Sequence, residues 1–364
     1  MVRFCSFRSV FLLFFLFFIS STGSFAQTDI IAADEALAPV KINGKWGYLD
    51  KMGKLVIPAR YDFAGVFTEG CAPVQISVFW GYINKKGDWF LRPVFTQASN
   101  FNNRRAKISL FDPTDSVTIT GYITPEGEFL YKLEEFEVGY DYRDKLVRVR
   151  SADYAGLAFG YRDSTGIYVI QPRFDAAMDF SEGLAAMMLG KKWGFTSPKN
   201  DFAIFPRFDE AYSFNEGHAF AREGKKKGFI NHAGKMVINL SKYDEVSPFM
   251  YEEMIAVRKN GKMGFANKKG KLTIKAIYDN PLLGAFSEGL AAVAVKGADD
   301  KLKWGYINKS GEMVIEAVFE EANSFFQDRA RIKINGKYGF IDKTGKIIAE
   351  PVYDEALDFS PTYK

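Results

Sequence analysis

The stretch from Lys45 to Asp62, KWGYLDKMGKLVIPARYD, decides the fold because imperfect copies of it recur to the end of the chain. The Gly that follows Trp46 sets the register of these copies. The equivalent residues are Gly47, Gly81, Gly121, Gly160, Gly194, Gly228, Gly264, Gly305 and Gly339. They lie 34 to 41 residues apart, a period typical of repeat architectures, so nine copies fill the chain.

Each copy predicts three short strands joined as an antiparallel meander. Around Gly305 the strands are 290–296, 304–308 and 312–315, which are rich in β-branched and aromatic residues. The first turn is shortest where it reads Asn43-Gly44, Asn260-Gly261 or Asn335-Gly336. Asn and Gly tolerate the positive φ that a tight hairpin requires, so the first two strands are predicted to pair.

The second turn has a signature of its own. Six residues after each register Gly stands another Gly or, once, an Asn. These residues are Gly53, Gly87, Gly127, Gly166, Asn200, Gly234, Gly270, Gly311 and Gly345. Three residues earlier stands Asp, Asn, Ser or Thr, as in Asp50 and Ser197, which favours a type I turn followed by a left-handed residue.

Three further features carry structural expectations. Pro58 and its equivalents are predicted to end the third strand. The acid after them, as in Asp62 or Asp209, is predicted to cap a short helical turn such as 209–211, with calcium binding as the alternative. The Gly in mid-strand predicts that an aromatic ring lies over its bare backbone. The Glu of the later Phe-x-Glu-Gly turns, as in Glu182, is expected to be solvated.

No single copy can bury its aromatic residues alone, so neighbouring copies are predicted to stack. We favour an all-β open, curved array of nine three-stranded meanders over 38–364. A closed β-propeller-like ring is the alternative. Propeller blades usually have four strands and 40 to 45 residues, in rings of four to eight. The closed ring remains an alternative because 38–42 is a first strand that could complete the last copy.

The N-terminus is typical of a secretory signal. Arg3 and Arg8 precede an apolar run, 10–19, and Ser24-Phe25-Ala26 predicts cleavage after Ala26. Residues 1–26 are therefore predicted to be a signal peptide and 27–37 a short linker. The mature protein is expected in the periplasm, the cell envelope or the exterior, without membrane insertion.

Composition narrows the function classes. Without Arg3 and Arg8 the chain has 46 basic and 44 acidic residues, interspersed, which argues against a nucleic-acid partner. Cys71 is the one Cys outside the signal, so no internal disulfide is expected, and its strand position predicts a buried, inert thiol. His218 and His232 lack metal-ligand spacing, and we predict no metal, no cofactor and no catalytic residues.

The compound motif of Lys-Trp-Gly-Tyr, Lys-x-Gly-Lys, Ile-x-Pro-x-Tyr-Asp and Phe-Ser-Glu-Gly resembles the bacterial WG repeat, also called the KWG repeat. The resemblance covers about 38–360. It implies a secreted or envelope-located, β-rich bacterial protein, and it brings no catalytic residues. Trp46, Trp80, Trp193 and Trp304 keep the Trp, whereas Thr120, Phe159, Lys227, Met263 and Tyr338 replace it. Copies three and four, at about 106–175, depart most from the pattern.

Binding residues stay unassigned from sequence, and the aromatic residues are the main candidates. The Trp residues of the repeat and Tyr338 could stack sugar rings, although their spacing favours a place in the core. Aromatic residues outside the pattern are better candidates for a surface: Trp89, Tyr131, Tyr140, Tyr142 and Tyr154. The first hypothesis is a non-enzymatic module that binds a protein or a glycan. The alternatives are an envelope-acting enzyme or inhibitor with a site in 131–161, and a structural spacer.

Overall fold

The computed structural model describes residues 36–134, 137–152, 158–297 and 299–359. The predicted signal peptide and most of the predicted linker lie outside these residues, as does Tyr154. Every regular element within the described ranges is a β-strand. In the same ranges no helix has the length and apolar character needed to cross a membrane.

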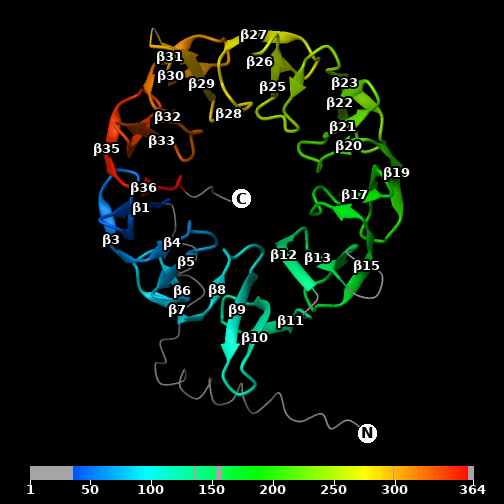
Figure 1. Cartoon of the computed structure of the whole chain (residues 1–364), viewed down its shortest axis with the longest axis vertical. Coiled ribbons are helices and arrows are strands. Elements are labelled where there is room, and N and C mark those ends of the chain that lie inside the picture. The colour runs from blue at the N-terminus through cyan, green and yellow to red at the C-terminus, as the bar shows by residue number, and fades with distance from the viewer. Residues whose placement is uncertain (1–35, 135–136, 153–157, 298, 360–364) are drawn as a thin grey trace. The chain divides into compact units, whose positions relative to one another are not determined.

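The compact unit of residues 35–364 contains nine antiparallel sheets of four strands each, arranged around a ring (Figure 1). We number these sheets as blades: blade 1 is β36 with β1 to β3, blade 2 is β4 to β7, and so on to blade 9, β32 to β35. In each blade the first strand faces the centre of the ring and the fourth forms its rim (Figure 1).

The strands are as follows, from the centre outwards. The first strands are β36 (Glu355–Ala356), β4 (Phe63–Ala64), β8 (Gln97–Ala98), β12 (Glu137–Arg143), β16 (Ala176–Ala177), β20 (Glu210–Ala211), β24 (Glu245–Val246), β28 (Phe286–Ser287) and β32 (Glu321–Ala322). The second strands are β1 (Ala38–Ile42), β5 (Cys71–Ile76), β9 (Ala106–Asp112), β13 (Leu146–Ser151), β17 (Ala185–Leu189), β21 (Ala219–Glu223), β25 (Met254–Lys259), β29 (Leu290–Lys296) and β33 (Arg329–Ile334). The third strands are β2 (Lys45–Leu49), β6 (Phe79–Asn84), β10 (Val117–Ile123), β14 (Ala158–Arg162), β18 (Lys192–Thr196), β22 (Lys226–Ile230), β26 (Lys262–Asn267), β30 (Leu302–Asn308) and β34 (Lys337–Asp342). The fourth strands are β3 (Leu55–Tyr61), β7 (Trp89–Phe95), β11 (Phe129–Lys132), β15 (Tyr168–Phe174), β19 (Phe202–Phe208), β23 (Met236–Asn239), β27 (Leu272–Tyr278), β31 (Met313–Phe319) and β35 (Ile347–Tyr353).

The all-β repeat is confirmed, and of the two arrangements the structure has the closed ring rather than the open array. Blade 1 is built from both ends of the chain, because Val40 and Lys41 of β1 pair with Ala356 and Glu355 of β36. The unit also has four strands rather than three. Its first strand is mostly two residues long, too short to show the alternation that marks a strand in sequence.

The predicted helical turn at 209–211 is wrong, because Glu210 and Ala211 form β20 and pair with β21. Pro58 does not end its strand either. It lies inside β3, at the rim of the blade, where an unpaired edge has no need of its missing N–H. The tight second turns are confirmed: Gly53 has a φ of 80° and Asn200 a φ of 66°.

The apolar core lies between blades, as the stacking argument predicted. One cluster joins Trp46, Tyr48 and Ile57 of blade 1 to Phe67 and Val74 of blade 2. Another joins blades 9 and 1, with Phe340 and Phe359 packed against Val40. No copy is therefore self-sufficient, and the last copy supports the first.

The mid-strand Gly is covered mainly by backbone rather than by the predicted aromatic ring, although at Gly121 the ring of Phe129 lies over it as well. In blade 8, Trp304 pairs with Phe319 and Tyr306 pairs with Ile315, so the rim strand bulges over Gly305. A Cβ on Gly305 would lie 2.5 Å from the carbonyl oxygen of Ile315. The Gly is required because the neighbouring strand occupies the space of a side chain.

Candidate functional site

The most regular residues of the repeat hold neighbouring blades together. The hydroxyl of Tyr48 donates to the carbonyl oxygen of Gly65 in blade 2 at 2.8 Å. Equivalent bonds run from Tyr82 to Ser99 at 2.7 Å and from Tyr306 to Asn323 at 2.7 Å. Burial raises the pKa of the Tyr48 hydroxyl, so it remains a donor.

The recurrent acids have structural partners as well. Asp209 accepts an ion-pair hydrogen bond from Lys192 of the preceding blade at 2.6 Å, and one from the backbone N–H of Gly224 at 2.7 Å. The same pair recurs as Lys45 with Asp62, Lys262 with Asp279 and Lys337 with Asp354. The acid therefore caps a β-hairpin, not the predicted helical turn, and its charge is matched by a lysine. The calcium alternative gains no support, since within the described ranges no three acidic, His or Cys side chains gather to hold a metal ion.

The Glu residues of the exposed turns also connect blades, so the expectation that they are merely solvated is wrong. Glu182 accepts hydrogen bonds from the backbone N–H of Gly217 at 3.0 and 3.1 Å. Glu252 does the same with Gly289 and forms an ion pair with Lys309 at 3.0 Å. Each of these side chains ties its turn to the turn of the next blade.

The Cys and His residues lie where the sequence predicts them. Cys71 is buried, and burial raises the pKa of its thiol well above the ordinary range, so it stays a neutral thiol. His232 is exposed, stacks on Phe214 with ring centroids 4.1 Å apart and approaches Glu182 at 3.4 Å. His218 contacts the carbonyl oxygen of Glu216 through Nδ1 at 2.8 Å.

The aromatic candidates outside the repeat pattern do not gather into one site. Trp89 packs edge-on against Tyr61, with centroids 6.2 Å apart, and Tyr131 packs against Tyr122 at 5.1 Å. Tyr140 lies under the guanidinium of Arg148 at 3.9 Å. The backbone of Tyr142 belongs to β12, and its side chain lies outside the described part of the structure.

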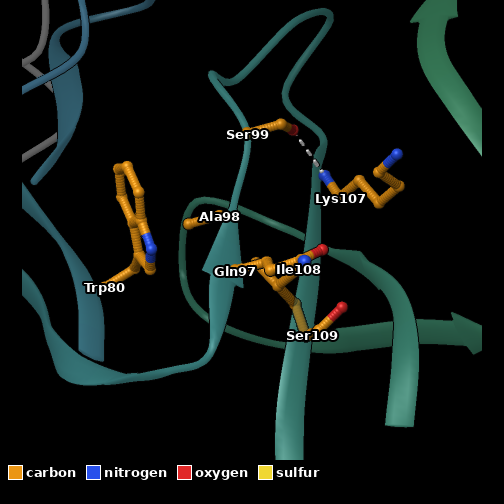
Figure 2. Close-up of a pocket in the computed structure, with 7 residues that line it drawn as sticks. All are labelled: Trp80, Gln97, Ala98, Ser99, Lys107, Ile108 and Ser109. Atoms are coloured by element: carbon orange, nitrogen blue, oxygen red, sulfur yellow. Dashed lines mark hydrogen bonds between the residues drawn. The ribbon is translucent and has the colours of Figure 1, made fainter. Parts of the chain in front are cut away.

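One aromatic residue of the repeat lines a hollow. A cleft of about 290 Å3 lies between blade 2 and blade 3, and we call it the blade 2–3 cleft. Figure 2 shows Trp80 on one side of this cleft and the strands β8 and β9 on the other. The lining residues are Trp80, Gln97, Ala98, Ser99, Lys107, Ile108 and Ser109.

At this cleft, two positions are less bulky than at the preceding junction. At the junction before it, Phe63 of β4 packs between Trp46 and Trp80, with centroids 5.6 and 5.3 Å away. Gln97 of β8 occupies the position of Phe63 in the next blade. The Trp position of that blade holds Thr120, whose hydroxyl bonds to Ser109 at 2.8 Å. Compared with that junction, a phenyl ring and an indole are replaced by polar side chains, and one side of Trp80 lines the cleft.

The polar groups of the cleft differ in their freedom to bind. Lys107 donates from Nζ to the carbonyl oxygen of Gly139 at 2.9 Å, and its backbone N–H donates to the hydroxyl of Ser99 at 2.9 Å (Figure 2). The exposed amide of Gln97 and the indole N–H of Trp80 make no hydrogen bond to the residues that the structure describes. These two groups are therefore available to a ligand.

A second cleft, of about 250 Å3, lies between blades 6 and 7. It too adjoins a copy without the Trp, since Lys227 stands in that position and donates to the backbone oxygen of Asp244 at 2.7 Å. Its other charged side chains are largely paired, as in Arg222 with Glu210 at 3.3 Å. This cleft is more strongly charged than the blade 2–3 cleft.

Comparison with protein families gives a match along most of the chain. The model described as "WG containing repeat" matches residues 46–77, 80–107, 159–193, 193–226, 228–262, 263–297, 304–338 and 338–360. The chain belongs to the WG-repeat family. Residues 108–158 of this WG-repeat protein fall between two matched segments, and the blade 2–3 cleft is lined mainly by residues of the matched segment 80–107. Comparison of the sequence with curated proteins gives no significant match.

Solved structures similar to this WG-repeat protein share little sequence with it. A crystal structure of a eukaryotic initiation factor is 9% identical, covers 90% of this chain and 98% of its own, and has a TM-score of 0.56, which shows a common fold. An uncharacterised protein from Listeria monocytogenes is 12% identical, covers 81% of this chain and 92% of its own, and has a TM-score of 0.37. A prolyl endopeptidase is 12% identical, with coverages of 85% and 55% and a TM-score of 0.40.

Sequence reasoning named Trp80 as a candidate for stacking but missed Gln97 and Lys107. The signal was present in Thr120, the smallest residue at the Trp position. Its meaning depended on knowing that the first strand of each blade faces the Trp position of the preceding blade. That relation requires the first strand, which the sequence did not reveal.

Proposed function

We propose that this WG-repeat ring is a non-enzymatic binding or scaffold module of the cell envelope or exterior, and that it recognises a protein or a glycan. One observation carries the proposal: the Tyr, Asp and Glu side chains that recur among the blades are used to join them. The residues that depart from the repeat leave clefts between blades. A rigid ring with local departures from its repeat is the usual arrangement of a recognition scaffold.

The use of the recurrent polar residues favours binding over catalysis. Asp209 is paired with Lys192, and Glu252 with Lys309. A general acid or base needs a pKa near neutral pH. The pKa of Asp209 is instead lowered by its hydrogen bond from Lys192 and then by that from Gly224. Such carboxylates hold the fold, and the binding groups are found elsewhere.

The apolar run 10–19 and the Ser24-Phe25-Ala26 segment support placement outside the cytoplasm. Expression of the full chain in a bacterium, followed by fractionation and mass measurement, tests this placement. We expect the mature protein in the periplasmic or extracellular fraction with Gln27 as its first residue. Full-length protein in the cytoplasm would contradict the localisation.

The binding role is tested by immobilising residues 27–364 and passing envelope extract over the resin. We expect retention of a specific protein or glycan that salt alone does not release. The Gln97→Phe variant, which fills the blade 2–3 cleft, shows whether retention depends on that cleft. Recovery of nothing beyond the background of an empty resin would favour the structural-spacer alternative.

A further inference from the structure

We infer that the blade 2–3 cleft binds one neutral sugar ring, stacked on Trp80 and hydrogen-bonded by Gln97. This inference rests on the proposed binding function and specifies the ligand of one site. The expected ligand is a neutral hexose or N-acetylhexosamine unit.

Trp80 supplies a flat apolar surface that is already fixed in place. Phe63 packs on the ring with centroids 5.3 Å apart, and the side toward Ala98 remains open to the cleft (Figure 2). Carbon-bound hydrogens of a sugar carry a slight positive charge and are attracted to the negative face of an indole. Because Phe63 restricts the ring before the ligand arrives, little conformational entropy is lost on binding.

Gln97 supplies the complementary polar contacts. Its amide has two N–H donors and a carbonyl acceptor, which can bond neighbouring hydroxyl groups that both donate and accept. The side chain is exposed at the first residue of β8 and lines the cleft together with Trp80. The indole N–H of Trp80 adds one more donor at the edge of the ring.

The charges of the cleft favour a neutral ligand. No carboxylate is among the seven lining residues. The one ionised side chain, Lys107, directs an Nζ donor to the carbonyl oxygen of Gly139 at 2.9 Å. Figure 2 shows the ammonium of Lys107 pointing away from Trp80, so it is not placed to receive the acidic group of a sugar stacked there. A cationic ligand would find no anion in the cleft.

The dimensions favour a sugar ring over a peptide strand. A volume of about 290 Å3 is at the lower end of the range for small-molecule sites, about 300 to 1,000 Å3. A peptide that added to the sheet would need a long free edge for backbone hydrogen bonds. The first strand here, Gln97–Ala98, has only two residues.

The test uses residues 27–364 and four probes: cellotetraose, chitotetraose, tetragalacturonate and a proline-rich decapeptide. Binding is measured by calorimetry and by quenching of tryptophan fluorescence. We expect a neutral tetrasaccharide to bind in the micromolar to millimolar range and the other two probes to bind at least tenfold more weakly. Gln97→Phe should weaken binding of the neutral sugar at least tenfold.

Gln97→Phe is expected to fold because it copies the packing of Phe63 on Trp46 at the preceding junction. Gln171→Phe is the matched control, since Gln171 is exposed on the rim strand β15, far from the centre of the ring. This control should bind the sugar as the unsubstituted protein does. Thermal melting of both variants verifies folding.

Three results would overturn the inference: no binding of either neutral sugar at 10 mM, equal binding by Gln97→Phe, or preferential binding of the acidic sugar or the peptide. The binding function is judged separately by the envelope extract experiment. If the extract yields a partner that Gln97→Phe still retains, the module binds elsewhere, and only the sugar site is refuted.

Discussion

Gly305→Ala is the sharpest test of how the blades are built. The substitution adds one methyl group at a place where the rim strand has no space for it. The new Cβ would lie 2.5 Å from the oxygen of Ile315 and 2.7 Å from the nitrogen of Ala317. Both atoms belong to the backbone of β31, so no side-chain rotation can relieve the contact.

The expected cost follows from the geometry. Relief requires β31 to shift outwards by several tenths of an ångström, which would disturb its pairing with Trp304 and Tyr306 in β30. Overpacking of this kind typically costs about 1 to 3 kcal/mol. We expect a loss in the upper half of that range, because the obstacle is a hydrogen-bonded strand rather than a flexible side chain.

Urea unfolding followed by tryptophan fluorescence measures the loss, with the unfolding slope checked for each variant. Gly297→Ala is the control in the same blade. Gly297 is exposed, and its new Cβ would come closest to a carboxylate oxygen of Asp299, at 3.0 Å, which can move away. The control should change stability by less than about 0.5 kcal/mol. Equal midpoints for the two variants would show that backbone crowding does not explain the invariant Gly of this repeat.

Three further outcomes follow from the ring. Ending the chain at Asp354 removes β36 and Phe359, which is 3% exposed and whose burial contributes about 1.5 to 3 kcal/mol. We expect a lower melting temperature and aggregation through the freed edge of β1. Unchanged melting with a monomeric protein would argue against closure of the ring. Asp209→Asn should lower the urea midpoint at pH 6. The ammonium of Lys192 lowers the folded pKa of Asp209 below its ordinary value of 3.8, so the stabilising effect is present above that value and is lost as the pH falls further. The two midpoints should therefore converge as the pH is lowered below 3.8, and a gap that stays constant would refute the ion pair. Glu252→Ala should cost about 1 kcal/mol through its lost hydrogen bond to the next blade, measured in the same urea assay, and a null effect would show that these turns are not coupled.

Local backbone conformation and burial could be predicted from the sequence where a residue type strongly favours one structural role. Asn200 replaces a Gly in the second turn and still has a φ of 66°, because Asn is the next residue to tolerate that conformation. The buried state of Cys71 and the sharing of a core between copies followed in the same way. These features depend on residues that are close in the sequence or in the adjacent copy of the repeat.

The ring itself depended on contacts that the sequence does not display. Glu210 and Ala211 look like the start of a helix after a capping Asp, and they become a strand only because Arg222 and Ala221 lie beside them. Two residues cannot show a period of two. Since the first strand was missed, the unit appeared to have three strands, and the argument for a propeller lost its main support.

The same hidden strand explains why the binding candidates were placed imperfectly. Sequence reasoning sought ligand contacts among aromatic residues that break the pattern, yet Tyr140 is engaged by Arg148 and Tyr131 by Tyr122. The clefts arise instead where the repeat loses an aromatic ring, at Thr120 and at Lys227.

A repeat ring can acquire a site by removing bulk as readily as by adding a functional group. At the junction of blades 1 and 2, the ring of Phe63 fills the space beside Trp46, which is 2% exposed. One junction later, Gln97 and Thr120 leave the equivalent space open. The backbone frame is retained because the bond from Tyr82 to Ser99 still joins blades 2 and 3, and the bond from Lys107 to Gly139 joins blade 3 to blade 4. Rigidity and a vacant aromatic surface therefore coexist at one junction, which is the physical requirement for recognition by a preformed site.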